Sequence, residues 1–299
     1  MHSYLYRVAA FLKPWCSEDE SFQLLKQATA NCGRRVPDRE IWQAVRNSKN
    51  DWKPGHTGNL SLPKLTPLEI ELASWPRRDY EAIERIAADG FSRADLWEHS
   101  PVRLEDETTD AESMIEALFP GDPLICVGRK VHAARTAHRS TFRGRFGALS
   151  YVVPSAMSKP IGKTQDGQDS ARSLQNCGPR QWHVLECDFK QEGEIGRILE
   201  THSLTVQDLC AAVLWHLAHE RPMVCAVHSG GKSIHGWYPA HGVTEARTRA
   251  FHRLAVSLGC DPITHNPVQW VRLPGGTRYP SKVRQSVQYF NPAALPDSG

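Results

Sequence analysis

The order of apolar runs between residues 182 and 290 constrains the fold of this 299-residue chain more than any other feature. Short runs rich in β-branched and aromatic residues alternate there with segments of helical period. The sequence predicts, in chain order, a strand at 182–189, helices within 193–220, strands at 223–228 and 234–238, a helix at 244–258, and strands at 268–273 and 286–290. We therefore expect an α+β fold with a split βαβ sheet of the ferredoxin or RRM-like kind.

The residues ahead of this succession are mainly of helical character. Ser17 with Glu20, and Thr109 with Glu112, have the spacing of capping boxes. The run 52–67 holds three prolines and two glycines and predicts a linker. We expect three parts: a helical N-terminal module at 1–60, a mainly helical connecting region at 61–120 and an α/β core at 121–299.

Composition excludes several classes of protein. A hydrophobic fraction of 40% supports a folded core, and a net charge of only +3 excludes a polycation that coats nucleic acid by charge alone. The eight cysteines include no C-x-x-C pair, which argues against a zinc ribbon and against a disulfide framework. Without a long apolar run, we expect a cytoplasmic protein with no membrane segment.

Two segments of the core have an unsettled role at this level. The stretch 129–145 is the most basic part of the chain, and it is equally typical of a surface that follows a phosphate backbone and of a solvated loop. Residues 155–181 are polar and glycine-rich, which predicts a long loop.

Glu186 and Asp188 stand two residues apart in a predicted strand, so both carboxylates share one face while Leu185 and Cys187 occupy the other. Such a pair can bind a hard cation such as Mg²⁺, which leaves coordination positions for substrate phosphates. A half-exposed strand with its polar residues outward gives the same pattern. The pair therefore needs support from other residues.

A glycine-rich segment, 228–237, comes directly after an apolar strand. Its glycines would let an anion approach the backbone, while Lys232, Ser233 and His235 offer donors to phosphate oxygens. The ending Gly-Lys-Ser suggests a P-loop, but the next residues are Ile-His-Gly-Trp-Tyr-Pro, which do not begin a helix. We expect instead a glycine turn between two strands.

The C-terminal part adds three charged residues. Asp261 precedes a proline, a setting more typical of a turn than of a metal ligand. Arg272 lies within an apolar strand, where an arginine needs an anionic partner. Arg278 follows two glycines, a setting that fits either a phosphate clamp or an exposed loop residue and slightly favours the loop.

The acidic pair, the glycine-rich turn ending in Ser-x-His, and a later aspartate followed by an arginine together resemble primases and primase-polymerases of the archaeo-eukaryotic type. The segments 229–238 and 271–278 resemble primase-like proteins of phages, plasmids and mobile elements in particular. The resemblance spans about residues 93–292 and is strongest from residue 182.

This resemblance implies a nucleotidyltransferase that copies single-stranded DNA by two-metal phosphoryl transfer with Mg²⁺ or Mn²⁺. It implies a catalytic and metal-binding role for Glu186, Asp188 and Asp261. It implies that nucleoside triphosphates are bound by Lys232, Ser233, His235 and Arg272.

The chain also departs from this family. Glu186 stands where many members have Asp, and the extra methylene would loosen the geometry that Mg²⁺ demands. The cysteine-rich zinc insertion of cellular primases has no counterpart, and a replicative helicase would be a separate chain. The alternatives are a replication-initiator or DNA-binding module that kept the fold without turnover, and a metal-dependent nuclease.

Overall fold

The computed structural model describes residues 2–13, 16–29, 36–48, 75–104 and 110–296. The chain divides into two compact units, residues 1–70 and 71–299. The predicted linker at 52–67 lies outside the described residues.

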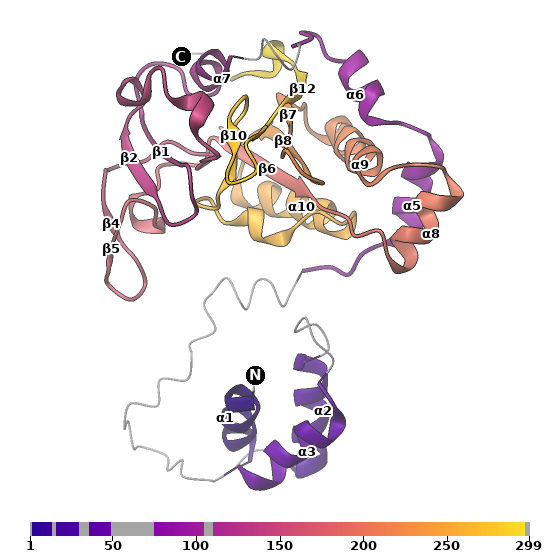
Figure 1. The fold of residues 1–299 in the computed structure, drawn as a ribbon. Coiled ribbons are helices and arrows are strands. Elements are labelled where there is room, and N and C mark those ends of the chain that lie inside the picture. Colours follow the sequence, from indigo (N-terminus) through magenta and orange to yellow (C-terminus); the bar gives the residue numbers. More distant parts are fainter. Residues whose placement is uncertain (1, 14–15, 30–35, 49–74, 105–109, 297–299) are drawn as a thin grey trace. The chain divides into compact units, whose positions relative to one another are not determined.

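The first unit contains the helices α1 (His2–Leu12), α2 (Glu18–Thr29) and α3 (Asp38–Asn47) (Figure 1). The predicted capping box at α2 is confirmed, because the Ser17 backbone N–H and hydroxyl both donate to a Glu20 carboxylate oxygen at 2.8 Å. Phe22 stacks on Trp42 with ring centroids 4.4 Å apart. The buried residues of this small core are Leu5, Ala9, Phe22, Leu25, Ile41, Ala44 and Val45.

The second unit begins with three more helices, α5 (Tyr80–Ala88), α6 (Arg93–Glu98) and α7 (Ala111–Leu118). Asp110 is the N-cap of α7, with its carboxylate accepting from the backbone N–H groups of Glu112 and Ser113. Thr109, which the sequence suggested for this role, lies outside the described residues. These helices pack into the same hydrophobic clusters as the strands of this unit.

A four-stranded antiparallel sheet in the order β12-β7-β8-β6 forms the centre of the second unit (Figure 1). β6 and β7 both pair antiparallel with β8 and so run parallel to each other on either side of it, which is the split βαβ arrangement. The mixed α+β fold is confirmed. The elements are β6 (Trp182–Cys187), α8 (Gly193–Thr201), α9 (Val206–Glu220), β7 (Cys225–His228), β8 (Ile234–Pro239), α10 (Glu245–Ser257) and β12 (Val287–Phe290).

One strand differs from the expected topology. The run 268–273 supplies only β9 (Val271–Arg272), which pairs with β3 in a second sheet of order β2-β1-β3-β9. On the side of β6 away from β8, the described chain makes a single bridge from Cys187 to Cys260. The apolar alternation of 268–273 identifies a strand but carries no information about its partner, which is why the sequence placed it in the wrong sheet. The other strands of this sheet are β1 (Leu124–Gly128), β2 (Ala134–His138) and β3 (Tyr151–Val152).

Short hairpins and 3₁₀ turns complete the second unit. The predicted loop at 155–181 contains a small hairpin and a 3₁₀ turn, in which the Asn176 side chain accepts from the Ser173 backbone N–H at 2.8 Å. The remaining short elements are β4 (Gly162–Lys163), β5 (Asp169–Ser170), β10 (Thr277–Arg278), β11 (Val283–Arg284) and the 3₁₀ turns η1 (Arg139–Phe142), η2 (Phe146–Ala148), η3 (Leu174–Asn176), η4 (Pro262–His265) and η5 (Pro292–Ala294).

Successive residues of β6 lie on opposite faces, as the alternation predicted, and the two faces pack into different cores. Leu185 and Cys187 pack in a cluster with α9 and α10, whereas Trp182 and Val184 pack in a cluster with β1 and β9. Glu186 therefore follows Trp182 and Val184 on the face toward the second sheet.

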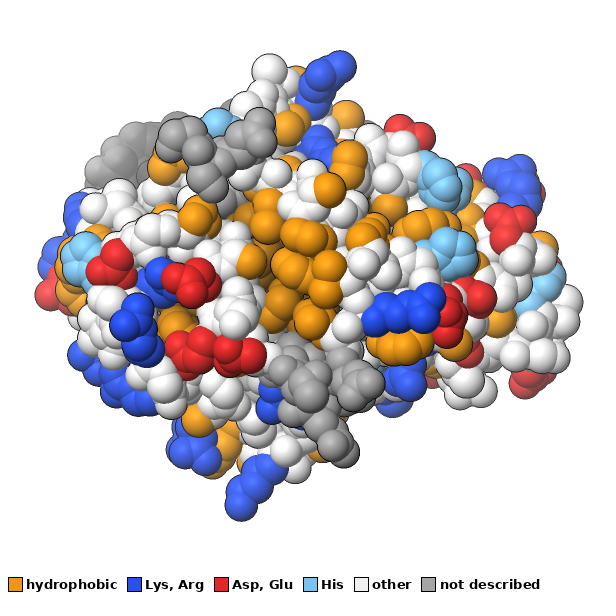
Figure 2. All heavy atoms as spheres, turned by 90° about the horizontal axis from the view of Figure 1, so that it is seen from above, with side chains coloured by type: hydrophobic (Ala, Val, Ile, Leu, Met, Phe, Trp, Pro, Cys, Tyr) orange, Lys and Arg blue, Asp and Glu red, His pale blue; other side chains and the backbone are white. Residues whose placement is uncertain are grey.

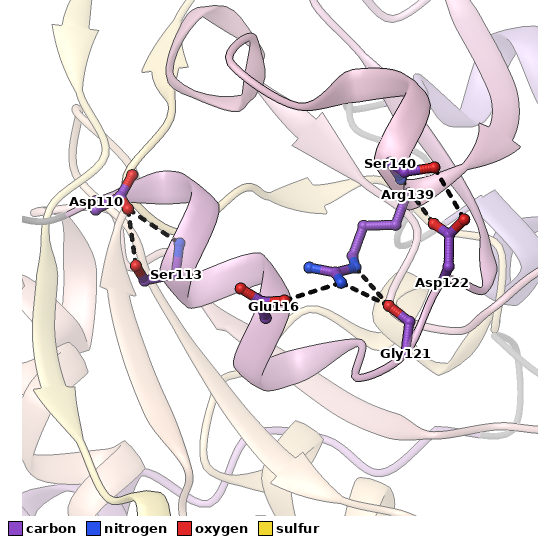
Figure 3. A network of polar contacts seen from close by, with 7 residues as sticks. All are labelled: Asp110, Ser113, Glu116, Gly121, Asp122, Arg139 and Ser140. Carbon is purple, nitrogen blue, oxygen red and sulfur yellow. Dashed lines mark hydrogen bonds and ion pairs between the residues drawn. The ribbon is translucent and has the colours of Figure 1, made fainter.

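Part of the basic stretch has a structural role. Arg139 donates to the Gly121 carbonyl and to Glu116 of α7, and Ser140 donates to both carboxylate oxygens of Asp122 (Figure 3). These contacts fasten η1 to the end of α7. Arg139 is only 13% exposed in its side chain, so it is not part of a phosphate-binding surface.

Candidate active site

Glu186, Ser233 and His235 meet across the β6–β8 ladder. Glu186 and His235 are directly opposed in the register, and His235 Nε2 lies 3.3 Å from Glu186 Oε1. The Ser233 hydroxyl donates to the same oxygen at 3.1 Å. The Ser-x-His spacing thus places both side chains on the strand face that Glu186 occupies.

The electrostatics of Glu186 reflect these neighbours. Burial by itself would raise the pKa of this carboxyl, but the His235 charge, the Ser233 hydroxyl and the charge of Arg272 lower the pKa to about 2. Glu186 is therefore ionised at neutral pH. The influence of Arg272 shows that this arginine, carried by β9 of the other sheet, lies close enough to act on the same carboxylate.

Asp261 lies on the other side of β6 from His235. Its backbone N–H donates to the Glu186 carbonyl at 2.8 Å, and its Oδ1 accepts from the Ile263 N–H at 2.9 Å as the N-cap of η4. Packing around the carboxyl raises the pKa of Asp261, and the negative charges of Glu186 and Asp188 raise it further. The three carboxylates that the sequence singled out are therefore electrostatic neighbours.

The carboxylates differ in exposure. Glu186 is half-buried, while Asp188 and Asp261 are exposed. Within the described ranges, no group of three or more His, Cys, Asp or Glu side chains has an arrangement that could hold a metal ion as it stands.

The glycine-rich segment is a tight turn between β7 and β8, as expected, and Ser233 leads into a strand rather than a helix, which confirms that it is no P-loop. The Ser229 N–H donates to the Ser233 carbonyl at 3.0 Å to close the turn. Gly230 has a φ of +71°, a conformation that favours glycine. A Cβ on Gly231 would collide with the guanidinium of Arg278.

Arg278 was wrongly interpreted as an exposed loop residue. It is half-buried in β10, and its guanidinium packs on the Gly231 backbone. The two glycines before Arg278 are typical of a free loop. The local pattern does not reveal that Arg278 pairs with Val283 in the β10–β11 hairpin, so the strand was missed.

The other expected phosphate-binding residues are Lys232, which lies in this turn, and Arg272, which lies in β9 of the second sheet. Lys232 is exposed at the tip of the turn. Arg272 packs its guanidinium 4.8 Å from the centre of the Tyr151 ring and extends Nη1 to 3.5 Å from Gln285 Oε1. Arg272 thus bridges the second sheet and the acidic cluster.

Sequence reasoning missed two residues that support the site. Gln285 is fully buried, and its amide donates to the Ser150 and Leu273 carbonyls. The Gln207 amide of α9 donates to the Gly231 carbonyl at 3.0 Å, which holds the turn against α9. Each contact joins residues far apart in the chain, so no local pattern could have indicated them.

No family model, no curated protein and no solved structure matches this chain. No helix among the described residues is long and apolar enough to cross a membrane.

Proposed function

We propose that this chain is a template-directed nucleotidyltransferase, a DNA primase or primase-polymerase that acts in the replication of a phage or other mobile element. Its substrates are nucleoside triphosphates and a single-stranded DNA template, and a replicative helicase would be a separate chain. The proposed catalytic core is the α+β unit that holds the site.

The contact of Glu186 with His235 and Ser233 carries the proposal. It joins an acidic cluster, which includes Asp188 and Asp261, to a row of hydroxyl and imidazole donors on the neighbouring strand. Phosphoryl transfer from a triphosphate needs both halves side by side, the first to hold divalent cations and the second to hold phosphate oxygens.

The donor chemistry of the acidic cluster fits Mg²⁺ or Mn²⁺, which prefer carboxylate oxygens. Burial raises the pKa of Asp261 most, and the negative charges of Glu186 and Asp188 add to this effect; a divalent cation would neutralise those charges. Glu186, Asp188 and Asp261 would hold the ions. When bound, they supply charge neutralisation at the transferring phosphoryl group and activation of the attacking hydroxyl.

The cationic and hydroxyl side chains would bind the triphosphate. Ser233 and His235 already hold one anionic oxygen, that of Glu186, at hydrogen-bond and ion-pair distances. A phosphate oxygen would take the same donors, with Lys232 and Arg272 adding positive charge. The Nδ1 atom of His235 is buried and lacks a hydrogen-bond partner among the described residues, so its hydrogen-bonding capacity is not used within the fold.

Incorporation of labelled nucleotide on a single-stranded DNA template tests this function, with and without a primer and with Mg²⁺ and Mn²⁺ supplied separately. The expected result is product from the native chain and none from Asp188→Ala. Product from neither chain under any of these conditions would contradict the proposal.

One observation favours a second candidate, a replication-initiator or DNA-binding module without turnover. Glu186 accepts the Ser233 hydroxyl and pairs with His235 inside the fold, and the described carboxylates do not converge on a common metal position. Template binding without any incorporation would identify this module. Nicking of DNA without added nucleotide would instead point to a nuclease.

A further inference from the structure

Acidic residues are absent from two long stretches of the chain. Residues 123–165 and 262–296 contain no Asp or Glu. The first stretch holds eight Lys or Arg residues and the second holds four. With a whole-chain net charge of only +3, these stretches must be locally much more positive than the rest of the molecule.

The fold brings the two stretches together. β3 of the first pairs with β9 of the second, and the Thr277 N–H donates to the Leu149 carbonyl at 2.9 Å. The Tyr279 N–H donates to the Ser150 hydroxyl at 3.0 Å. Residues 277–279 therefore lie along residues 149–150, and the Ser150 N–H in turn donates to the Gly128 carbonyl at the end of β1, so parts of the two acid-free stretches lie side by side.

An aromatic ring lies in this positive region. Tyr279 is 38% exposed, and Arg129 and Lys130 from the β1–β2 turn approach its ring to 5.3 Å and 4.9 Å from the centroid. No carboxylate of the described residues forms an ion pair with Arg129, Lys130 or the nearby Lys282. We call Tyr279, Arg129, Lys130 and Lys282 the Tyr279 surface.

The Tyr279 surface adjoins the candidate active site. Tyr279 follows Arg278, whose guanidinium packs on Gly231 of the phosphate-binding turn. Val283, on the same hairpin, lies against Gly230. A chain lying on this surface would pass beside the β7–β8 turn.

We propose that the Tyr279 surface binds single-stranded DNA, with a base stacked on Tyr279 and the phosphates held by Arg129, Lys130 and Lys282. Stacking requires an unpaired base, because the bases of a duplex already stack on one another and turn their faces away. On the face of the molecule in Figure 2, acidic and basic side chains are interspersed, so DNA binding there by a broad positive field is not favoured. The inference rests on the proposed function only in taking the bound strand as the template.

Binding is measured by fluorescence anisotropy with a labelled oligothymidylate, in chelator and without nucleotide, so that no catalysis is needed. Tyr279→Leu should weaken binding about tenfold, whereas Tyr279→Phe keeps the ring and should bind like the native chain. Arg129→Gln combined with Lys130→Gln should lower the salt dependence by about 1.4 in the slope of log K against log salt.

Arg103→Gln is the matched control, since Arg103 also packs over a half-buried aromatic ring, that of Trp97 at 4.9 Å, but pairs with Glu98 outside the Tyr279 surface. It should bind like the native chain. Thermal melting checks that each variant is folded.

Two outcomes would overturn the inference: Tyr279→Leu binding as tightly as Tyr279→Phe, or a preference for duplex over single strand. If Tyr279→Leu binds normally while nucleotide is still incorporated, this surface is wrong and the proposed function stands. If the Tyr279 surface binds as expected but nothing is incorporated, the enzyme function fails instead.

Discussion

Glu186 has two competing roles at the residue scale. Its carboxylate holds Ser233 and His235, the donors that a phosphate would need, and it is also a proposed metal ligand. Without metal, the carboxylate competes with an incoming phosphate because both are anions at neutral pH. When a divalent metal ion is bound, the same negative charge would serve to hold the ion.

Glu186→Gln separates these roles. In chelator, the variant should bind a fluorescent nucleoside triphosphate several-fold more tightly than the native chain, because a repulsive charge is removed from the phosphate donors. With Mg²⁺ or Mn²⁺ present, the same variant should lose nucleotide incorporation. Weaker binding in chelator would contradict the placement of the triphosphate at Ser233 and His235.

His183 and His252 form a buried pair next to η4, the 3₁₀ turn that Asp261 caps. His183 Nε2 and His252 Nδ1 are 2.7 Å apart, and His252 Nε2 lies 3.3 Å from the carbonyl of Pro262, the first residue of η4. When Nε2 of a neutral His252 donates to the Pro262 carbonyl, its Nδ1 carries no proton and can only accept. The proton between the two rings then belongs to His183 Nε2, and both rings can stay neutral. Burial lowers the pKa of His252 to about 3, and it lowers that of His183 as well.

The histidine pair predicts acid sensitivity. Because the folded pKa of His252 is lower than the unfolded value of 6.5, the unfolded state binds more protons between about pH 6.5 and about pH 3, and stability falls as the pH decreases through that window. Each such group lowers the free energy of unfolding by up to about 1.4 kcal/mol for each pH unit within this window. Urea melts should show a smaller loss of stability between neutral and acidic pH for His252→Gln than for the native chain. An equal loss would show that His252 does not titrate on unfolding.

At the scale of elements, the β7–β8 turn shows what the sequence can and cannot predict. The glycines, the strands on either side and the Ser-x-His spacing are all visible in the local pattern. The packing of Arg278 on Gly231 is not, since the two residues belong to separate hairpins.

Gly231→Ala tests this packing. The added methyl group would collide with the Arg278 guanidinium and shift the turn that carries Lys232 and Ser233, so triphosphate binding should weaken several-fold. In the background of Arg278→Ala, the same substitution should have little further effect, because the two residues are coupled. Gly147→Ala is the control, as a Cβ there meets no atom within 4 Å. Full additivity of the two substitutions would contradict the contact.

Periodicity recovered most of the elements between residues 182 and 290 but not all of their partners. The odd and even residues of β6 lie on opposite faces, as the alternation implied, but each face packs into a core of its own, which the alternation did not indicate. The segment around Arg272 was recognised as a strand yet assigned to the wrong sheet, because pairing is decided by tertiary packing. Asp261 looked like a turn residue, and it is indeed the N-cap of η4 as well as a neighbour of Glu186.

At the scale of the whole molecule, the candidate site and the Tyr279 surface both belong to the unit of residues 71–299. The acidic cluster lies at the end of β6, whereas Arg272 and the residues of the Tyr279 surface come from the two acid-free stretches. This separation of charge results from the order of the sequence, in which the acid-free stretches lie on either side of the strand that carries Glu186.

The most direct measurement is nucleotide incorporation on a primed single-stranded DNA template, comparing Asp188→Asn with Asp166→Asn. Asp166 is an exposed aspartate in the 155–181 loop, so its substitution removes the same charge away from the site. The native chain and Asp166→Asn should extend the primer in Mg²⁺ or Mn²⁺, and Asp188→Asn should lose at least about a hundredfold of that activity. Equal activity of the two variants, or no extension by the native chain, would contradict the proposed active site.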